Sequence, residues 1–219
     1  MDLQTIGFKH KTDKSGSNCG THTFNGKTLL DNYSRFFEPL RNESINLLEI
    51  GILDGGSLKT WEEYFPNAKI SALDIDPSKI EYKTNRTNIY IGSQDDPELI
   101  QSLKNDNPEK FDVILDDASH INRLTIASFE LLFSHLKPGG LYIIEDTCCA
   151  YGLDEYPTFI SDVKTWPGMN YNREDVSFEN RRSQIDQFLY PKIRDMDMKF
   201  GDIFAFHFFS ETLIIEKNK

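Results

Sequence analysis

Short, nearly continuous apolar runs alternate along the chain with amphipathic stretches. The runs are rich in Ile, Leu, Val and Tyr, as in strands covered on both faces, and occupy residues 45–51, 68–76, 87–92, 111–117 and 140–146. Between the last two runs, apolar residues recur at helical spacing at Ile121, Phe129, Leu132 and Leu136, and residues 136–140 (LKPGG) supply a helix stop. Strands that alternate with helices predict a mostly parallel sheet with right-handed crossovers.

Both ends of the chain extend this pattern. A helix before the first strand is predicted by the spacing of Leu30, Tyr33, Phe37 and Leu40. Residues 200–209 and 211–218 are β-rich runs separated by a polar turn, which predicts a hairpin. We expect its aromatic residues to be packed, namely Phe204, Phe206, Phe208 and Phe209. The predicted fold class is α/β: a doubly wound, mostly parallel, seven-stranded sheet that ends in an antiparallel strand pair.

One region breaks the hydrophobic period. Residues 147–198 hold many polar residues together with Pro157, Trp166, Pro167 and Gly168, and they are long for a connection after a strand. Long insertions after the carboxyl end of a strand are often lids. We therefore expect a single domain over residues 1–219, with a lid or acceptor-binding insertion at about 147–198.

The composition narrows the class of protein. A chain of 219 residues can bury a core without disulfides or a structural metal. Its 24 Lys and Arg against 35 Asp and Glu give a formal net charge of −11, which disfavours nucleic acid as a partner. No apolar run approaches the roughly 18 residues of a membrane helix, and no secretory signal pattern opens the sequence. Its three cysteines are typical of reduced thiols, so we expect a cytoplasmic protein with no membrane partner.

The first strand is followed by a glycine-rich turn. In open α/β sheets, ligands bind outside the carboxyl ends of the strands, and glycine lets the backbone approach a ligand closely. The residues at this strand end and turn are Glu49, Gly51, Gly55, Gly56 and Ser57. Their spacing is neither GxGxxG nor GxxxxGK[ST], which disfavours a dinucleotide or a triphosphate site. An ordinary βα turn is the alternative interpretation.

Polar residues also follow the next two strands. Asp74 lies about 20 residues beyond the glycines, where an acid commonly accepts hydrogen bonds from ribose hydroxyls. After the third strand, Ser93, Gln94 and Asp95 suit the edge of a nucleobase. Asp96, which precedes Pro97, fits a helix cap equally well.

The fourth and fifth strands, neighbours in such a sheet, end in acids. Asp116 and Asp117 end one, and Glu145 and Asp146 end the other. Four carboxylates would repel one another unless a positive group neutralises them, and carboxylate oxygens are the ligands of Mg²⁺. Because side chains alternate along a strand, we expect only one of Asp116 and Asp117 to face the cleft. For Asp116 a strand-end or capping role is the alternative.

A histidine stands close to this acidic cluster. His120 lies three residues after Asp117, where the following helix opens. The positive end of a helix dipole depresses the pKa of an imidazole and keeps it able to accept a proton. We interpret His120 as a functional group, although a lone histidine in this setting is more often a surface residue or a cap.

Four stretches, in this order, resemble the class I S-adenosylmethionine-dependent methyltransferases: LLEIGILDGG (47–56), ALDIDP (72–77), FDVILDDASH (111–120) and LKPGGLYIIED (136–146). Within that superfamily the chain looks most like the metal-dependent sugar O-methyltransferases of macrolide biosynthesis. The matching stretches are TDKSGS (12–17), DDxSH (116–120), EDT (145–147) and HFFSETLIIEK (207–217). The resemblance covers about residues 9–146 and 200–217. It implies a Rossmann-like fold and makes an assembly of identical chains plausible.

The resemblance also implies roles for individual residues. S-adenosylmethionine would be held at its methionine end by Glu49, Gly51 and the turn of Asp54, Gly55, Gly56 and Ser57, at its ribose by Asp74, and at its adenine by Ser93, Gln94 and Asp95, with Asp116 nearby. Magnesium would be bound by Asp117, Glu145 and Asp146, and His120 would be the general base. An N-terminal segment, about residues 1–44, would close over the cofactor through Thr12, Asp13 and Lys14.

The resulting hypothesis is a metal-assisted O-methyltransferase that transfers a methyl group to a hydroxyl of a sugar or glycosylated small molecule. A metal-dependent, catechol-like phenol O-methyltransferase is the main alternative. An NAD-linked oxidoreductase would share the sheet but would need a tighter glycine pattern. A non-catalytic nucleotide-binding protein would not need the intact acidic cluster.

Overall fold

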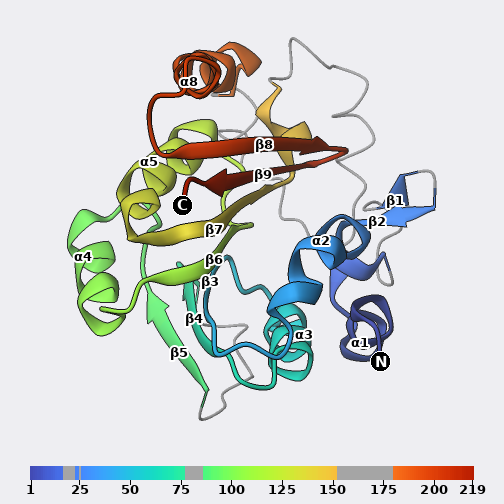
Figure 1. Ribbon diagram of the computed structural model, residues 1–219. Helices are drawn as coiled ribbons and strands as arrows, with labels where there is room; N and C mark the ends of the chain where they lie inside the picture. The colour runs from blue at the N-terminus through green and yellow to red at the C-terminus, as the bar shows by residue number, and fades with distance from the viewer. Residues whose placement is uncertain (17–22, 25, 77–85, 152–179) are drawn as a thin grey trace.

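The computed structural model describes all residues except 17–22, 25, 77–85 and 152–179 (Figure 1). At its centre lies a seven-stranded sheet in the order β5-β4-β3-β6-β7-β9-β8. These strands are β3 (Asn46–Ile50), β4 (Lys69–Asp74), β5 (Thr87–Ile91), β6 (Phe111–Asp116), β7 (Leu136–Glu145), β8 (Ile203–Phe209) and β9 (Thr212–Lys217). The first five strands in this order, β5, β4, β3, β6 and β7, pair in parallel, whereas β9 is antiparallel to both β7 and β8. The predicted sheet with its antiparallel end is confirmed.

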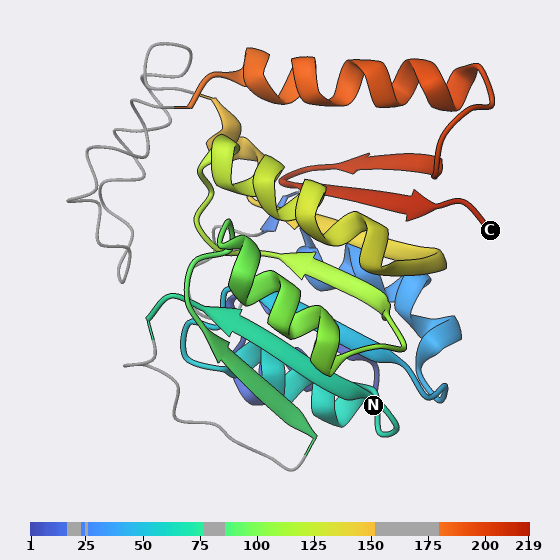
Figure 2. The ribbon, with the colours of Figure 1, turned by 90° about the vertical axis from the view of Figure 1, so that its left-hand side faces the viewer.

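Helices cover both faces of this sheet, as a doubly wound fold requires. The helices are α1 (Leu3–His10), α2 (Leu29–Phe37), α3 (Gly56–Tyr64), α4 (Pro97–Asp106), α5 (Asn122–Leu132) and α8 (Arg182–Asp197). Short 3₁₀ turns are η1 (Asp13–Ser15), η2 (Glu38–Leu40), η4 (Phe133–His135) and η5 (Thr147–Ala150), and a small hairpin joins β1 (Thr23–Phe24) to β2 (Lys27–Thr28). Figures 1 and 2 show α1, α2 and α3 on one face and α4, α5 and α8 on the other.

Two hydrophobic clusters, one on each face, hold the layers together. Side chains alternate along the central strands, so β6 sends Val113 and Leu115 to the cluster under α1–α3 and Ile114 to the cluster under α4, α5 and α8. Residues buried on both faces explain why the predicted strands were nearly continuous apolar runs. In the described part of the chain, no helix has the length and apolar character to span a membrane.

Two predictions about elements were wrong. Leu136 belongs to β7, paired with Phe111, because α5 ends at Leu132; residues 136–140 are therefore part of a strand and not a helix stop. Phe204 and Phe208 are exposed, since β8 is the edge strand. No element was predicted within 147–198, where the structure has η5 and α8, and α8 packs against α5 and β8. Pro157, Trp166, Pro167 and Gly168 lie outside the described residues.

Candidate active site

The carboxyl ends of β3, β4 and β6 are joined by backbone hydrogen bonds beyond the strands themselves. The Gly51 N–H donates to the Leu73 carbonyl at 2.8 Å, and the Asp117 N–H donates to the Ile50 carbonyl at 2.8 Å. Gly51 has a φ of 92°, and a Cβ at that position would lie 2.1 Å from the Asp117 carbonyl oxygen. The strand ends can approach this closely only because residue 51 is glycine.

The glycine turn leads directly into α3. Gly55 is its N-cap, with a φ of 80°, and Gly56 is its first residue. Ser57 donates its hydroxyl to Glu49 at 2.9 Å, which ties the first turn of α3 back to β3. The tight turn predicted from the sequence is therefore present.

Glu49 is a fully buried acid at the end of β3. Its Oε1 atom has no hydrogen-bond partner among the residues that the structure describes. Burial raises the pKa of Glu49 to about 7, although Lys14 and the Ser57 hydroxyl act in the opposite direction. A buried carboxylate oxygen that accepts no hydrogen bond, with only the Lys14 ammonium 3.9 Å away, is a suitable acceptor for a polar group of a ligand.

Asp74 braces the same turn from the end of β4. One of its oxygens accepts the Ile52 N–H at 2.6 Å and the other accepts the Asp76 N–H at 2.8 Å. The side chain thus lies beside the glycine turn, where a ribose-binding acid was predicted. Each carboxylate oxygen can accept a further hydrogen bond.

The predicted nucleobase residues lie at the end of β5, and one of them meets Asp116. Buried Gln94 donates its Nε2 to both oxygens of Asp116 at 3.2 Å, and Ser128 also donates to Asp116. Burial raises the pKa of Asp116 to about 6. The other two predicted residues bond to each other, since the Ser93 hydroxyl donates to Asp95. Asp116 therefore points into a buried polar group beneath α5, opposite to Asp117, as strand alternation predicted.

Asp96, which could have been either a site residue or a cap, is a cap in this structure. Its side chain accepts the N–H groups of Glu98 and Leu99 at the start of α4. The capping interpretation of this residue is confirmed.

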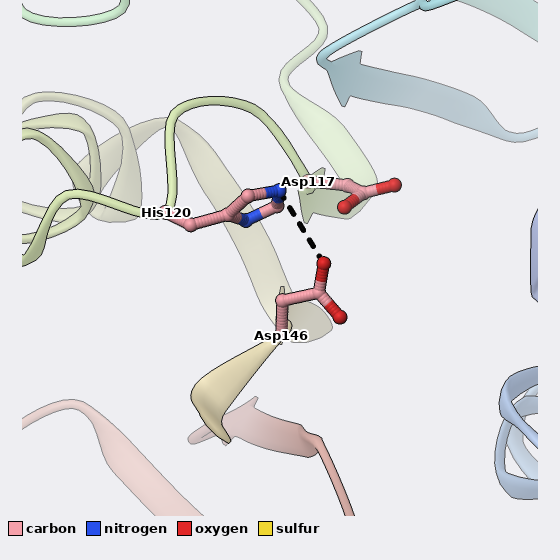
Figure 3. Close-up of side chains that lie close together, drawn as sticks. All are labelled: Asp117, His120 and Asp146. Carbon is pink, nitrogen blue, oxygen red and sulfur yellow. Dashed lines mark ion pairs between the residues drawn. The ribbon is translucent and has the colours of Figure 1, made fainter. Parts of the chain in front are cut away.

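Asp117, His120 and Asp146 converge at the ends of β6 and β7 (Figure 3). Each offers one ligand atom, and these atoms lie within 4.8 Å of one another. His120 Nε2 is 3.3 Å from Asp146 Oδ2. Two carboxylates and an imidazole in this arrangement can hold a divalent cation, or can orient and deprotonate a hydroxyl group.

His120 does not lie within the first turn of the helix. Helix α5 begins at Asn122 with Ile121 as its N-cap, and His120 precedes both. Its φ is 54°, and Asp146 has a φ of 51°, so both members of the pair adopt the left-handed conformation that is rare for residues other than glycine. The segments that follow β6 and β7 therefore both have a rare backbone conformation at this site.

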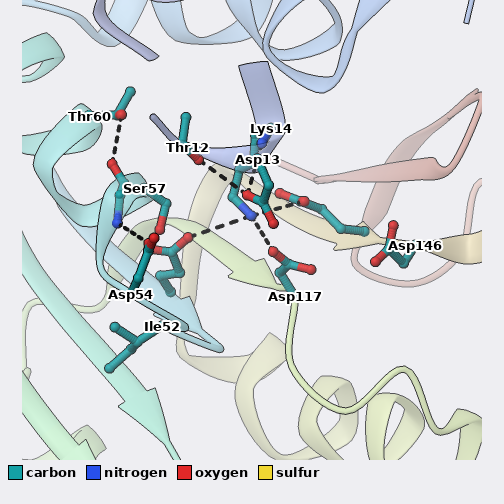
Figure 4. A network of polar contacts seen from close by, with 12 residues as sticks. Thr12, Asp13, Lys14, Ile52, Asp54, Ser57, Thr60, Asp117 and Asp146 are labelled. Carbon is teal, nitrogen blue, oxygen red and sulfur yellow. Dashed lines mark hydrogen bonds and ion pairs between the residues drawn. The ribbon is translucent and has the colours of Figure 1, made fainter. Parts of the chain in front are cut away.

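Lys14 from the N-terminal segment enters the acidic cluster and supplies its positive charge (Figure 4). Its side chain is only 2% exposed, and its ammonium contacts Asp117, lies 3.0 Å from Glu145 and lies 3.9 Å from Glu49. Burial alone would lower the pKa of Lys14, but Asp117 and Glu145 outweigh it and raise that pKa well above its usual value. Lys14 therefore remains charged.

Glu145 is placed differently from the two acids that join His120. It accepts a hydrogen bond from Lys14 through Oε2, while its buried Oε1 has no hydrogen-bond partner in the described part of the chain. Burial, followed by the negative charge of Asp117, raises its pKa well above the usual value. The structure thus brings two of the three predicted metal ligands together with the predicted base, and holds the third against Lys14.

A pocket adjoins this cluster on the side of α8. Its volume is about 30 Å³, and it is lined by polar residues, namely His120, Asn122, Thr125, Glu145, Asp146 and Thr147, and by apolar ones, namely Ile144, Ala150, Ile185, Phe188, Leu189 and Leu213. That volume has room for a single small group, since typical small-molecule sites hold roughly 300 Å³ or more. This pocket could not be predicted from the sequence, because α8 was not predicted.

Comparison with known proteins identifies relatives of this chain. No protein-family model matches it. It is 38% identical over 157 residues to demethylmacrocin O-methyltransferase of Streptomyces fradiae, covering 68% of this chain and 37% of that protein. It is 36% identical over 157 residues to L-olivosyl-oleandolide 3-O-methyltransferase of Streptomyces antibioticus, covering 68% of this chain and 38% of that protein.

A solved structure extends the similarity to the whole chain. It is the MycE methyltransferase of the mycinamycin pathway in complex with Mg, SAH and mycinamycin VI, with a TM-score of 0.72 and 28% identity over 100% of this chain and 55% of that one. The chain is a homologue of the macrolide-sugar O-methyltransferases. The family resemblance drawn from the motifs is confirmed, and so is the Rossmann-like methyltransferase fold. The match spans less than two fifths of the length of these two curated relatives.

Proposed function

We propose that this chain is an S-adenosylmethionine-dependent O-methyltransferase that uses a divalent cation to methylate a hydroxyl group of a sugar or glycosylated small molecule. The observation that carries the proposal is the convergence of Asp117, His120 and Asp146 beside the glycine turn. It is supported by relatives named as O-methyltransferases, one of them for L-olivosyl-oleandolide, and by the MycE complex with Mg, SAH and mycinamycin VI.

The residues around the glycine turn fit the cofactor. Buried Glu49 accepts no hydrogen bond at Oε1 from the described residues and has only the Lys14 ammonium 3.9 Å from that oxygen, so it offers an acceptor. Glycine at the turn lets the backbone approach a ligand closely. Asp74 would bind the ribose, while Ser93, Gln94 and Asp95 would lie on the adenine side, with Asp116 holding Gln94 in place. Residues 1–44 would form the segment that covers the cofactor through Thr12, Asp13 and Lys14.

The acidic cluster fits magnesium. Its donors are carboxylate oxygens, which Mg²⁺ prefers, and Glu145 keeps one buried oxygen without a partner among the described residues. Asp117, Glu145 and Asp146 would hold the ion, which when bound would polarise the acceptor hydroxyl and lower its pKa. This matters because a sugar alcohol is a much weaker acid than a phenol.

His120 would act as the general base. It would take the hydroxyl proton onto an imidazole nitrogen while the hydroxyl oxygen forms its bond to the methyl carbon and the carbon–sulfur bond of the sulfonium breaks, its electron pair going to sulfur. Asp146, 3.3 Å from Nε2, would orient the ring and stabilise the imidazolium that forms. The remaining task is alignment of the acceptor, which the surrounding residues supply by holding it in place.

The acceptor would approach His120 from the α8 side, where the pocket of about 30 Å³ has room for a single small group of it. The insertion at residues 147–198 would take part in binding the rest of the acceptor. We also propose a cytoplasmic enzyme, because Cys148 and Cys149 are free thiols, and an assembly of identical chains. Because the net charge is −11, we expect no nucleic-acid partner. We also propose that the protein has no membrane partner.

The test is cofactor binding and methyl transfer on the purified protein. We expect calorimetric binding of S-adenosylmethionine and its demethylated product, and Mg²⁺-dependent transfer of labelled methyl to glycosylated macrolides in preference to catechol. His120→Gln should lower kcat about 10²- to 10⁴-fold, because it removes the general base. Asp117→Asn should lower kcat by more, because cation binding supports both alignment and deprotonation of the acceptor.

The matched control is Asp112→Asn, on the same strand but at its opposite end, where Asp112 pairs with Lys137 at 2.7 Å. This variant should retain transfer. Failure of the wild-type protein to bind either cofactor form, or equal transfer by the Asp117 and Asp112 variants, would contradict the proposal.

A further inference from the structure

Asn180 is a buried residue that bridges three segments of the site. It lies just before α8 and is 1% exposed. Its Nδ2 donates to the His120 carbonyl at 2.8 Å and to the Cys149 carbonyl at 2.7 Å, and its Oδ1 accepts the Asn122 N–H at 2.9 Å. One amide group thus joins the loop after β6, the turn after β7 and the start of α5.

The two carbonyls that Asn180 binds belong to the segments that present His120 and Asp146. His120 and Asp146 both have positive φ, a strained conformation for a residue with a Cβ that persists only where the surroundings enforce it. Asn180 binds the carbonyl of His120 itself. It also binds Cys149, whose N–H donates to the Asp146 carbonyl at 2.8 Å.

Asn122 reinforces the same junction. It is 3% exposed, and its Nδ2 lies within hydrogen-bond distance of the carbonyls of Ala150 and Arg181, each at 3.0 Å, and of Gln184 Oε1 at 2.9 Å. Asn122 and Asn180, the asparagine clasp, therefore fasten α5 and the turn after Asp146 to the beginning of α8. The sequence contains no motif that would have indicated this pairing.

We propose that the asparagine clasp is a positioning device for His120, which sets the 3.3 Å separation between His120 Nε2 and Asp146 Oδ2. Its effect on turnover rests on the proposed function, whereas its effect on the geometry of His120 does not. The clasp touches the backbone of the site and not the reacting groups, so both asparagines are positioning residues.

The test compares two isosteric substitutions of buried asparagines. Asn180→Asp keeps an acceptor for the Asn122 N–H but removes both donors and places an oxygen against the carbonyls of His120 and Cys149. Asn46→Asp is the matched control, because Asn46 is 7% exposed and donates its Nδ2 to the Lys110 carbonyl at 2.9 Å, at the amino-terminal end of β3 and away from the site. Both variants lose buried hydrogen bonds, but only one lies at the site.

The first readout is the histidine side-chain ¹H–¹⁵N spectrum, which needs no catalytic activity. The chain has 5 His, and His120→Gln assigns the signal of His120. Asn180→Asp should shift or broaden that signal, whereas Asn46→Asp should leave it in place. An unchanged His120 signal in Asn180→Asp would overturn the proposal.

The second readout is turnover. We expect Asn180→Asp to lower kcat about 100-fold, the cost typical of a displacement of about 1 Å, while the Kd of the demethylated cofactor stays within about threefold. A kcat in Asn180→Asp equal to that of Asn46→Asp would also overturn the proposal. Should Asn180→Asp not fold, Asn180→Ala removes the same donors without adding repulsion and is measured in the same two ways. If the wild-type protein transfers no methyl group, the proposed function fails, and the spectrum alone decides the role of the clasp.

Discussion

Lys14 brings a buried positive charge to the acids of the site. Its ammonium faces three carboxylates, those of Glu49, Asp117 and Glu145, in a region with little access to water. Removal of one partner from a buried ion pair is costly because it leaves an uncompensated charge. Lys14 also contacts two of the three acids that would hold magnesium, so ammonium and cation would compete for the same oxygens.

Replacement of this lysine should therefore have opposite effects on stability and on cation binding. In metal-free protein, Lys14→Met should reduce the free energy of unfolding by about 3–5 kcal/mol. Added Mg²⁺ should restore more stability to the variant than to the wild type, because the ion replaces the lost charge and meets no competitor. Urea unfolding with and without Mg²⁺ measures both effects.

Lys9→Met is the control for this experiment. Lys9 pairs with Glu63 at 2.6 Å, but its side chain is 53% exposed, so the loss should be below about 1 kcal/mol and independent of Mg²⁺. If Mg²⁺ stabilised the Lys14 variant and the wild type equally, competition between ammonium and cation would be refuted.

The acids of the site could be predicted residue by residue, but their positive partner could not. Asp116, Asp117, Glu145 and Asp146 follow strands, and parallel strands bring their carboxyl ends together. The need for positive charge also followed from the sequence. Lys14 could not be chosen to supply it, because it lies 103 positions before Asp117 and its approach depends on how the N-terminal segment packs.

At the scale of elements, predictions succeeded where burial imposes a period and failed where it does not. The central strands are buried on both faces, so their apolar runs were visible in the sequence. Helix α8 was missed because only Leu189 among its residues is fully buried and because Pro191 lies inside it. The aromatic residues of the edge strand β8 were expected to be packed, because an aromatic-rich sequence does not distinguish an exposed edge strand from a buried one.

The junction between β3 and β6 offers a test of close packing at a strand end. Gly51→Ala must both hold alanine at a φ of 92° and move the Asp117 carbonyl, which lies 2.1 Å from the new Cβ. We expect a loss of at least about 4 kcal/mol, since an overpacked backbone contact cannot relax by a rotamer change. Urea denaturation gives this value directly.

Gly26→Ala separates the two causes. Gly26 has a φ of 74°, but a Cβ there would meet nothing within 4 Å, so only backbone strain of about 1 kcal/mol is expected. Equal losses at positions 26 and 51 would show that the strand ends do not depend on the absence of a side chain at Gly51.

At the scale of the whole molecule, the two hydrophobic clusters share one set of strands. Along β7, Leu141 and Ile143 belong to the cluster under α1–α3, while Tyr142 and Ile144 belong to the one under α4, α5 and α8. Because the same strands form one wall of each cluster, unfolding of these strands would expose both clusters. The described domain should therefore unfold as a single cooperative unit, as small two-state proteins do.

A substitution on one face, observed from the other, tests this cooperativity. Phe129 of α5 is 3% exposed and packs against Tyr142 and Phe188. Phe129→Ala should cost about 3–5 kcal/mol by leaving a cavity. The probe is Trp61, buried in the opposite cluster, in a Trp166→Phe background that leaves it as the sole one of the 2 Trp.

If the sheet couples the two faces, Phe129→Ala should lower the urea midpoint seen by Trp61 fluorescence as much as the midpoint seen by far-ultraviolet circular dichroism, with equal slopes. A Trp61 transition that stays at the wild-type midpoint while the dichroism transition moves would mean that the α1–α3 face unfolds independently. The site contains residues from both faces of the sheet, since Lys14 comes from the α1–α3 side and Asn180 from the α8 side. If the domain unfolds as a single cooperative unit, these residues keep their relative positions in every folded molecule at urea concentrations below the midpoint.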